Sequence, residues 1–344
     1  MLINKISERL AWVDFAKGFA IILVVYRHIM IGIERAGLDV DYVYVVANEI
    51  VFTFRMPLFF ILTGIFIEKS LGRRKSREFV SNKFDTLMYP YLIWATIQVT
   101  IQVVMSNFTN ANRGALDYLY ILIQPRAIDQ FWYLFALFNV SILFLLIYKY
   151  TNLKRVYLVL LAIVLHYLSQ YVSDYSLIHD TLYYFIFLCV GYITSHFLLD
   201  FNFYKKFNPY LTFLIILPIF VATQIYWLNN QPLNIFVLTT ISLLGSAMAI
   251  NISILGSKIP YFNFFAYAGK YSLYIYVLHV IVSAAARIVF IHFFNIQNVP
   301  FLLITGIVVG TILPIVIYKY SHKFGYNFLF YPPKNKPSKI TIAK

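Results

Sequence analysis

Residues 19–33 read FAIILVVYRHIMIGI, an apolar run that extends on both sides to cover residues 12–34. A helix needs about 20 mainly apolar residues to cross a bilayer, so this stretch predicts a membrane span. Arg27 and His28 stand side by side within it. Ionisable groups inside a span are costly and usually mark functional sites. The same stretch therefore predicts both the class of fold and the place of a site.

The composition extends this interpretation to the whole chain. Of 344 residues, 61% are hydrophobic and only 12% are charged, whereas about a quarter of the residues of a soluble domain are charged. We therefore expect a polytopic membrane protein whose main partner is the lipid bilayer. The net charge of +14 would suggest nucleic acid in a soluble chain, but here it reflects Lys and Arg in cytoplasmic loops. No nucleic-acid partner is expected.

The fold class that follows is an all-α transmembrane bundle. Stretches of sufficient length and apolarity lie near residues 12–34, 46–67, 84–106, 130–148, 155–173, 181–199, 209–228, 233–253, 271–294 and 299–320. The longer link at 106–130 has room for a short re-entrant or interfacial helix. Cys189 is the single cysteine, which excludes an internal disulfide and a cysteine-based metal site. No metal is expected.

Loop charge predicts the orientation of the bundle. The link after the second span contains GRRKSR (72–77), whereas SDYSLIHD (173–180) is acidic and NNQ (229–231) is uncharged. By the positive-inside rule both termini are cytoplasmic, and ten spans is an even number, as this requires. We divide the chain into a transmembrane domain at 1–325 and a cytoplasmic tail at 326–344, whose proline and lysine content is typical of disorder.

The first span contains two candidate functional residues. Lys17 lies near its cytoplasmic mouth, and His28 follows eleven residues later, about 16 Å further along a helix and on nearly the same face. A lone histidine in a membrane helix often serves only as a hydrogen-bonded packing residue. The neighbouring Arg27 and a second group of basic residues favour a functional role.

The second group begins in FTFRMPLFFILTG (52–64), where Arg55 comes shortly before Pro57. Proline kinks a helix, so Arg55 either lines a ligand site or is a buried partner of an acid such as Glu49. Arg73, Arg74 and Arg77 follow the second span; they either set topology beside anionic lipid or bind phosphate. In a helix, positions 73 and 77 would share one face.

These stretches together resemble the acyltransferase family 3 membrane proteins, bacterial O-acyltransferases that modify surface and exported polysaccharides. The stretches that carry the resemblance are RLAWVDFAKGFAIILVVYRH (9–28), FRMPLFFILTG (54–64), GRRKSR (72–77), KFDTLMYPY (83–91), QFWYLFALF (130–138) and GKYSLYIYVLH (269–279). Lys17 and His28 match a family motif of a basic residue and a histidine separated by ten residues. Arg74 and Arg77 match a second motif. Arg27 is less usual in the family, and histidine is common where Arg55 stands.

The resemblance implies transfer of an acyl group from acetyl-CoA to a sugar hydroxyl, in the bacterial cytoplasmic membrane. The acceptor would be an exported or cell-surface polysaccharide or its lipid-linked precursor. His28 would act as the base or accept the acyl group, and Arg27 or Arg55 would stabilise the oxyanion. The donor's phosphates would be held by Lys17, Arg73, Arg74 and Arg77.

The alternative is a transporter or flippase for a polysaccharide or a lipid-linked sugar, with the charges of the spans along its path. Such transporters commonly contain repeated halves with matching Gly/Pro-interrupted segments. The sequence has one such interruption, at Met56 and Pro57, and no matching half. A receptor or structural membrane protein would leave the intramembrane histidine and arginines without a purpose.

Overall fold

A computed structural model describes residues 2–104, 113–151, 153–200 and 207–333, and all of these that lie in regular structure are helical. Within this part of the chain, ten helical segments are long and apolar enough to cross a membrane, which confirms the predicted fold class. They are Ala11–Arg35, Tyr42–Gly72, Ser76–Val104, Pro125–Tyr150, Arg155–Val172, Ser176–Leu198, Pro209–Asn229, Ile235–Gly256, Ser272–Phe293 and Val299–Lys323.

The long helices are α1 (Leu2–Arg35), α2 (Tyr42–Gly72), α4 (Tyr89–Val104), α6 (Trp132–Tyr150), α7 (Arg155–Leu168), α8 (Ser176–Leu198), α10 (Pro209–Asn229), α11 (Ile235–Gly256), α13 (Ser272–Ile288) and α14 (Val299–Lys323). Shorter elements are α3 (Ser76–Lys83), α5 (Asp117–Ile123), α12 (Asn263–Lys270), the π-helical turns η1 (Phe84–Met88) and η5 (Val289–Phe293), and the 3₁₀ turns η2 (Pro125–Phe131), η3 (Ser169–Val172), η4 (Pro260–Phe262) and η6 (Asn327–Leu329).

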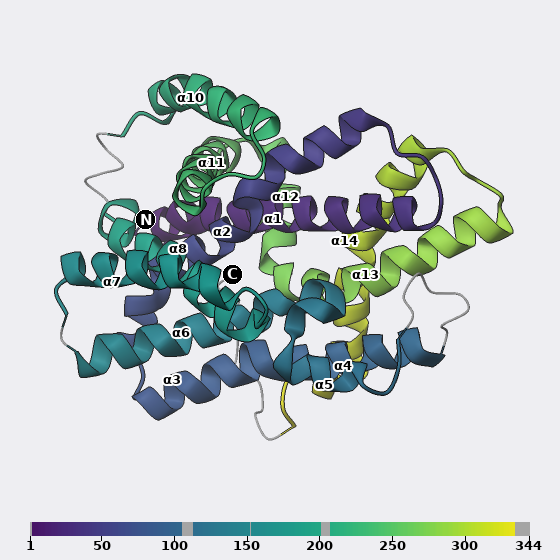
Figure 1. Ribbon diagram of the computed structural model, residues 1–344, viewed down its shortest axis with the longest axis horizontal. Coiled ribbons are helices and arrows are strands. Elements are labelled where there is room, and N and C mark those ends of the chain that lie inside the picture. The colour runs from purple at the N-terminus through teal and green to yellow at the C-terminus, as the bar shows by residue number, and fades with distance from the viewer. Residues whose placement is uncertain (1, 105–112, 152, 201–206, 334–344) are drawn as a thin grey trace.

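Helix α1 runs along the middle of the bundle (Figure 1) and packs against α2, α11, α12, α13 and α14. Its Ala16, Ala20, Ile21 and Val25 are fully buried. By contrast, α10 lies at the edge of the bundle (Figure 1) and exposes large apolar side chains such as Leu214, as expected beside lipid. The helix that carries Lys17 and His28 is therefore surrounded by five other helices, and several of its side chains are enclosed by protein rather than lipid.

A close approach of backbones fixes α12 against α1. A Cβ atom on Gly18 would collide with the carbonyl oxygen of Phe265, and one on Gly269 would collide with the carbonyl oxygen of Asp14. Small residues allow such contacts between membrane helices. The contact brings Lys270, the last residue of α12, beside the first turns of the span that carries Lys17.

Some boundaries differ from the sequence prediction. The third span begins at Ser76 rather than near 84, because α3, η1 and α4 continue one another. In the link at 106–130, the short helix α5 lies where the sequence left room for one, but the fourth span begins at Pro125 rather than near 130. Residues 105–112 lie outside the described part. Packing continues past the expected tail boundary at 326, since Phe330 is buried and Tyr331 bonds to Tyr274. Residues 334–344 lie outside the described part.

Candidate active site

A cavity of about 1960 Å³ opens among α1, α2, α3, α6, α12, α13 and α14. We call it the Lys17 cavity, and the end of the bundle where it lies the Lys17 end; the opposite end, where α1 finishes, is the Arg35 end. The lining runs along α1 from Asp14 to Ile21 and along α13 from Ser272 to Tyr276. The cavity therefore extends from the end of the bundle into its interior.

Positive charge dominates the lining of the Lys17 cavity. Its cations are Lys17, Arg77, Lys83, Lys270 and Lys319, against the carboxylates of Asp14, Glu78 and Asp85. The ion pair between Lys17 Nζ and Asp14 Oδ1 is long at 4.0 Å. Glu78 accepts a hydrogen bond from the backbone N–H of Lys75, which caps α3. An arrangement with more cations than carboxylates is suited to an anionic ligand such as a phosphate.

The structure separates the basic residues predicted from the sequence. Lys17 and Arg77 line the cavity, whereas Arg73 and Arg74 are outside its lining, in the turn between α2 and α3. Arg74 Nη1 donates to Ser70 Oγ at 3.1 Å. Because the chain leaves the helix at residues 73–75, Arg73 and Arg77 do not share the helical face that we expected for a continuous helix.

Sequence reasoning missed three cations of the cavity: Lys83, Lys270 and Lys319. Lys83 and Lys270 fall within the stretches KFDTLMYPY and GKYSLYIYVLH that carry the resemblance, which is the signal that could have identified them. Lys319 has no such signal. Its position becomes visible only when α14 is packed beside α12, where its Nζ donates to Tyr267 Oη at 2.5 Å.

Tyrosine rings form one wall of the cavity. Tyr274 and Tyr318 stack with ring centroids 3.5 Å apart, and Tyr271 lies against both. Tyr331, from the segment after α14, bonds to Tyr274. All four rings line the cavity. Their flat faces beside lysine ammonium groups can accept a planar aromatic group of a ligand.

Two histidines meet deeper in the bundle. The rings of His28 on α1 and His279 on α13 lie edge to face, with centroids 5.1 Å apart. His279 is fully buried, and its Nδ1 is 3.0 Å from the carbonyl oxygen of Ile275 and 2.8 Å from that of Tyr276. Carbonyl oxygens only accept, so Nδ1 carries the proton. Nε2 is then a free base, and no partner for it is found in the described part of the chain.

A thin layer of buried side chains separates His28 from the Lys17 cavity. Tyr133 and Tyr276 line the cavity, but neither histidine does. Tyr276 Oη donates to the carbonyl oxygen of Gln130, and the Tyr276 ring lies 6.0 Å from that of His279. Tyr133 stands beside Tyr276 at 5.3 Å. This layer, Tyr133, Tyr276 and Gln130, is the boundary that a ligand must pass to reach the histidines.

The two intramembrane arginines both lie near one ring. The guanidinium carbons of Arg27 and Arg55 are 5.8 Å and 5.4 Å from the centre of the Phe52 ring. Arg55 is only 3% exposed and donates to Asn48 Oδ1 at 2.9 Å. Asn48 in turn donates to Glu49 Oε1 at 3.3 Å. The direct Arg55–Glu49 pair considered from the sequence is thus replaced by an amide bridge.

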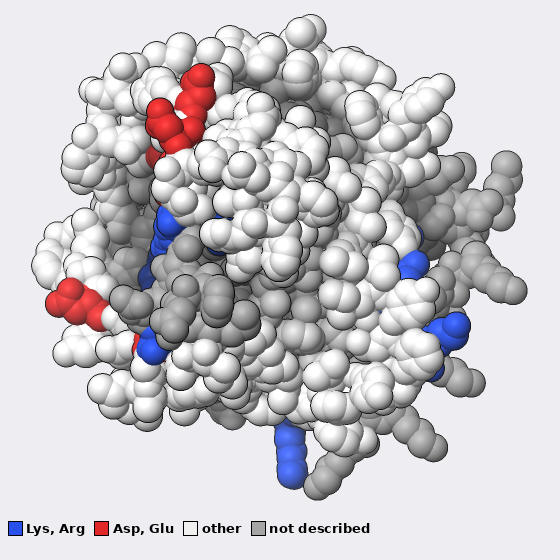
Figure 2. Space-filling model, turned by 90° about the vertical axis from the view of Figure 1, so that its right-hand side faces the viewer, with Lys and Arg blue, Asp and Glu red and all other residues white. Residues whose placement is uncertain are grey.

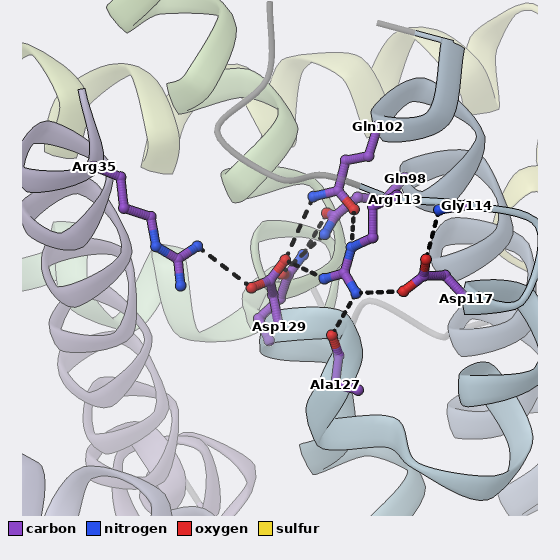
Figure 3. A network of polar contacts seen from close by, with 9 residues as sticks. Arg35, Gln98, Gln102, Arg113, Gly114, Asp117, Ala127 and Asp129 are labelled. Atoms are coloured by element: carbon purple, nitrogen blue, oxygen red, sulfur yellow. Dashed lines mark hydrogen bonds and ion pairs between the residues drawn. The ribbon is translucent and has the colours of Figure 1, made fainter. Parts of the chain in front are cut away.

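Ion pairs tie the helices together at the Arg35 end (Figure 3). Arg35 lies 3.6 Å from Asp129, and Arg113 reaches Asp129 at 3.2 Å and Asp117 at 2.9 Å. The Gly114 N–H, which donates to Asp117 at 2.6 Å, together with Arg113, holds the pKa of that carboxyl below its usual range. Asp129 adopts a φ of 63°, an uncommon value for a residue other than glycine. These contacts hold η2 in place.

Arg126 makes a further pair on the same element. It contacts both carboxylate oxygens of Asp180, at 2.8 and 2.9 Å from its Nε, and its guanidinium lies 4.2 Å from the centre of the Trp132 ring. Asp180 is 2% exposed, and His179 Nδ1 also lies 3.0 Å from it. The sequence prediction did not include this pair, because its members are 54 residues apart.

Comparison with known proteins places the chain in a family. Nodulation protein NolL of Mesorhizobium japonicum is 27% identical over 143 residues, 41% of this chain and 36% of the relative. Nodulation protein NolL of Sinorhizobium fredii is 25% identical over 181 residues, 52% of this chain and 47% of the relative. The aligned part of the chain thus spans less than half the length of these relatives. No solved structure matches significantly. The acyltransferase domain model matches residues 10–319, and the chain is therefore a multi-pass membrane protein that belongs to this acyltransferase family.

Proposed function

We propose that this protein transfers an acetyl group from acetyl-CoA to a sugar hydroxyl of an exported or cell-surface polysaccharide, or of its lipid-linked precursor. The bacterial cytoplasmic membrane is its proposed location. The observation that carries the proposal is the Lys17 cavity, in which more cations than carboxylates surround a space that extends toward His28 and His279. A CoA thioester has the matching parts: phosphates at one end, and a long arm that ends in the reactive carbonyl.

In this proposal the donor enters the cavity with its phosphates at the Lys17 end and its thioester toward His28. Its phosphates would contact Lys17, Arg77 and the three further lysines of the lining, and its adenine would lie on the tyrosine wall. Arg73 and Arg74 would act from the rim. Lys17 and His28 are eleven residues apart on one continuous helix, or about 16 Å, which the pantetheine arm can span. The Lys17 end would then face the cytoplasm, in agreement with the loop charges.

The proposed reaction needs one base and one oxyanion donor. The sugar oxygen attacks the thioester carbonyl while its proton passes to the imidazole of His28. The carbon–sulfur bond then breaks, and the thiolate takes the proton to leave as free CoA. In the covalent variant, the His28 imidazole attacks the thioester and expels the CoA thiolate. The sugar oxygen then attacks the acetyl group, the bond from that group to the imidazole nitrogen breaks, and the sugar proton passes to the thiolate, which leaves free CoA and His28. Arg55 or Arg27 would donate N–H groups to the negatively charged carbonyl oxygen.

His28→Ala tests the reaction. In purified protein supplied with labelled acetyl-CoA and a glycan acceptor, it should lower acetyl transfer by at least about 100-fold, the usual worth of a positioned base. CoA binding should change little. His292→Ala is the matched control, since His292 is an exposed histidine of η5, and it should keep wild-type transfer.

In cells, mass spectrometry of surface glycans should show acetyl groups lost from the His28→Ala mutant, whereas a transporter mutant would lose the exported glycan itself. Wild-type transfer by His28→Ala would exclude His28 from the reaction.

Single cysteines test the orientation. After Cys189 is replaced, a cysteine at Ser76 or Ser257 should be protected from impermeant thiol reagents in intact cells, whereas one at Asn230 should react. Ser76 begins α3 at the Lys17 end, and Asn230 follows α10. Labelling of the Ser76 variant from outside would place the Lys17 cavity on the wrong side for cytoplasmic CoA.

A further inference from the structure

Arg27, like Arg287 of α13, has no ion pair in the described part of the chain, which distinguishes it from three other arginines of the Arg35 end. Arg35, Arg113 and Arg126 each have a carboxylate oxygen within 3.6 Å. No carboxylate lies within ion-pair distance of Arg27 in the described part of the chain, and its recorded contact is with the face of Phe52. Its side chain is half-buried. A guanidinium held partly out of water without a counter-ion is costly, because a buried charge is stable only when it is paired.

The nearest acid does not neutralise this region. Glu49 is close enough to interact electrostatically with both Arg27 and Arg55, so two guanidinium groups share one carboxylate. That carboxylate accepts its hydrogen bond from Asn48, which also separates it from Arg55. Glu34 also lies close enough to attract Arg27, but Arg35 and Arg126 lie close enough to repel it. Neither Glu34 nor Glu49 forms an ion pair with Arg27, so its guanidinium can still accept an anion.

The region is open to a ligand from the Arg35 end. The Phe52 ring is 40% exposed, and His28 next to Arg27 is only partly buried. Figure 2 faces this end of the molecule and shows some Lys and Arg side chains set back on the left of the view, others at its right and lower edges, and acidic side chains further out on the left. Arg27 itself is partly exposed and does not line the Lys17 cavity.

We propose that Arg27 binds an anionic group of the acceptor, a carboxylate or a phosphate, so that the protein acetylates acidic rather than neutral glycans. The inference rests on the proposed acetyl transfer and names the class of acceptor. The charge of Arg27 is close enough to act on His28, so an anion held by Arg27 would bring the rest of the sugar near His28. Arg55, whose guanidinium has further N–H groups beyond the one bonded to Asn48, remains available for the oxyanion.

Binding without turnover gives the first test. Purified protein is titrated with D-glucuronate, D-glucose 1-phosphate and D-glucose, and the variants Arg27→Gln and Arg35→Gln are compared. Wild type should bind at least one anion about 10-fold more tightly than glucose, as a charge-assisted contact predicts. Arg27→Gln should abolish this preference. Arg35→Gln, which removes the same charge two turns further out where Asp129 already pairs with it, should keep it. Equal affinity of wild type for all three sugars overturns the proposal.

Turnover then identifies the source of the anion. Acetyl transfer is measured to a glucuronate-containing oligosaccharide and to its carboxyl-reduced form, and to a lipid-linked diphosphate sugar and to the free sugar. The ratio of kcat/KM for the charged and neutral members of a pair should fall by about 10-fold in Arg27→Gln. A lower ratio for the oligosaccharide pair indicates that the anion is the carboxylate of a uronic acid. A lower ratio for the lipid-linked pair indicates that it is the diphosphate of a lipid carrier. An equal loss for charged and neutral acceptors contradicts the inference. Absence of transfer to any acceptor by wild type would instead reject the proposed function, and the binding comparison would still decide the role of Arg27.

Discussion

The two ends of the bundle both contain clustered basic residues, but they use them differently. At the Lys17 end five cations line an open cavity with three carboxylates, and the pair between Lys17 and Asp14 is 4.0 Å long. At the Arg35 end most arginines are held by aspartates at 2.7–3.6 Å (Figure 3), and those aspartates connect separate elements. Similar residue types thus leave charge available for a ligand at one end and hold the fold together at the other. Arg27, which has no such partner, carries our inference about the acceptor.

The sharpest contrast is expected from Arg113→Ala. It leaves Asp117 and Asp129 without their shared partner, and the side chains involved are at most 22% exposed. We expect the free energy of unfolding to fall by about 3 kcal/mol, with an unchanged KM for acetyl-CoA. Denaturant titration and donor kinetics on the same preparation measure both quantities. If Arg113→Ala instead raised the KM for acetyl-CoA and left stability unchanged, Arg113 would serve donor binding and not the fold.

Arg77→Ala should behave in the opposite way. Loss of one charge-assisted phosphate contact should raise the KM for acetyl-CoA by about 10- to 100-fold, while thermal stability changes little. Arg77→Lys should recover only part of the lost affinity for acetyl-CoA, because lysine restores the charge but not the planar fork of donors. Arg73→Ala, in the turn outside the cavity lining, is the control and should change the KM by less than about 2-fold. Full activity of Arg77→Lys would indicate that the residue serves only topology.

Lys17→Ala should have a smaller effect on the same constant. Its ammonium is 38% exposed and lies within 4.0 Å of Asp14, so solvent and a neighbouring carboxylate already screen it. We expect the KM for acetyl-CoA to rise by about 3- to 10-fold, with kcat nearly retained. Isothermal titration with CoA checks the affinity directly. A loss of kcat alone would place Lys17 in the chemical step rather than in donor binding.

The smallest effect is a pH dependence at the Arg35 end. The pKa of Asp117 is lowered in the folded protein by the Gly114 N–H and Arg113, so its stabilisation is fully present above the unfolded pKa of about 4 and is lost as the pH falls through the folded pKa. Asp117→Asn should lower the Tm by about 2 °C near neutral pH. The difference from wild type should shrink below about pH 4. A constant difference across that range would mean that ionisation of Asp117 is not involved.

The fold could be predicted because membrane spans follow from apolar length, and all ten were located from that property. The predicted start of the third span was wrong because its first turns, SREFVSNK, are polar although helical. Gly72 was a signal that the second helix ends there, because glycine is common at helix ends. Arg73 comes directly after that end and Arg77 lies in α3, so the two arginines are not on one continuous helix. The Asn48–Arg55 contact was also accessible, since residues seven apart share a helix face.

The candidate site could be predicted only in part, because much of it depends on packing between distant segments. Lys17 and Arg77 were identified from motif spacing, and the structure brings both to one cavity. Lys270 reaches that cavity through the Gly18–Gly269 contact, for which two isolated glycines give no sequence signal. The pairing of His28 with His279 joins segments 251 positions apart. Spacing along one helix cannot indicate a partner on another.

The layer of Tyr133, Tyr276 and Gln130 has a consequence for the electrical properties of the membrane. A protein with polar hollows at both ends of a bundle risks conducting ions, and each elementary charge that crosses 100 mV dissipates about 2.3 kcal/mol. These three side chains are no more than 6% exposed, and the Tyr276–Gln130 bond joins α13 to the segment before α6. The layer therefore places two packed aromatic rings and a bonded amide between the Lys17 cavity and the two histidines, and in the proposed reaction it would be the barrier that keeps water and ions from following the acyl group.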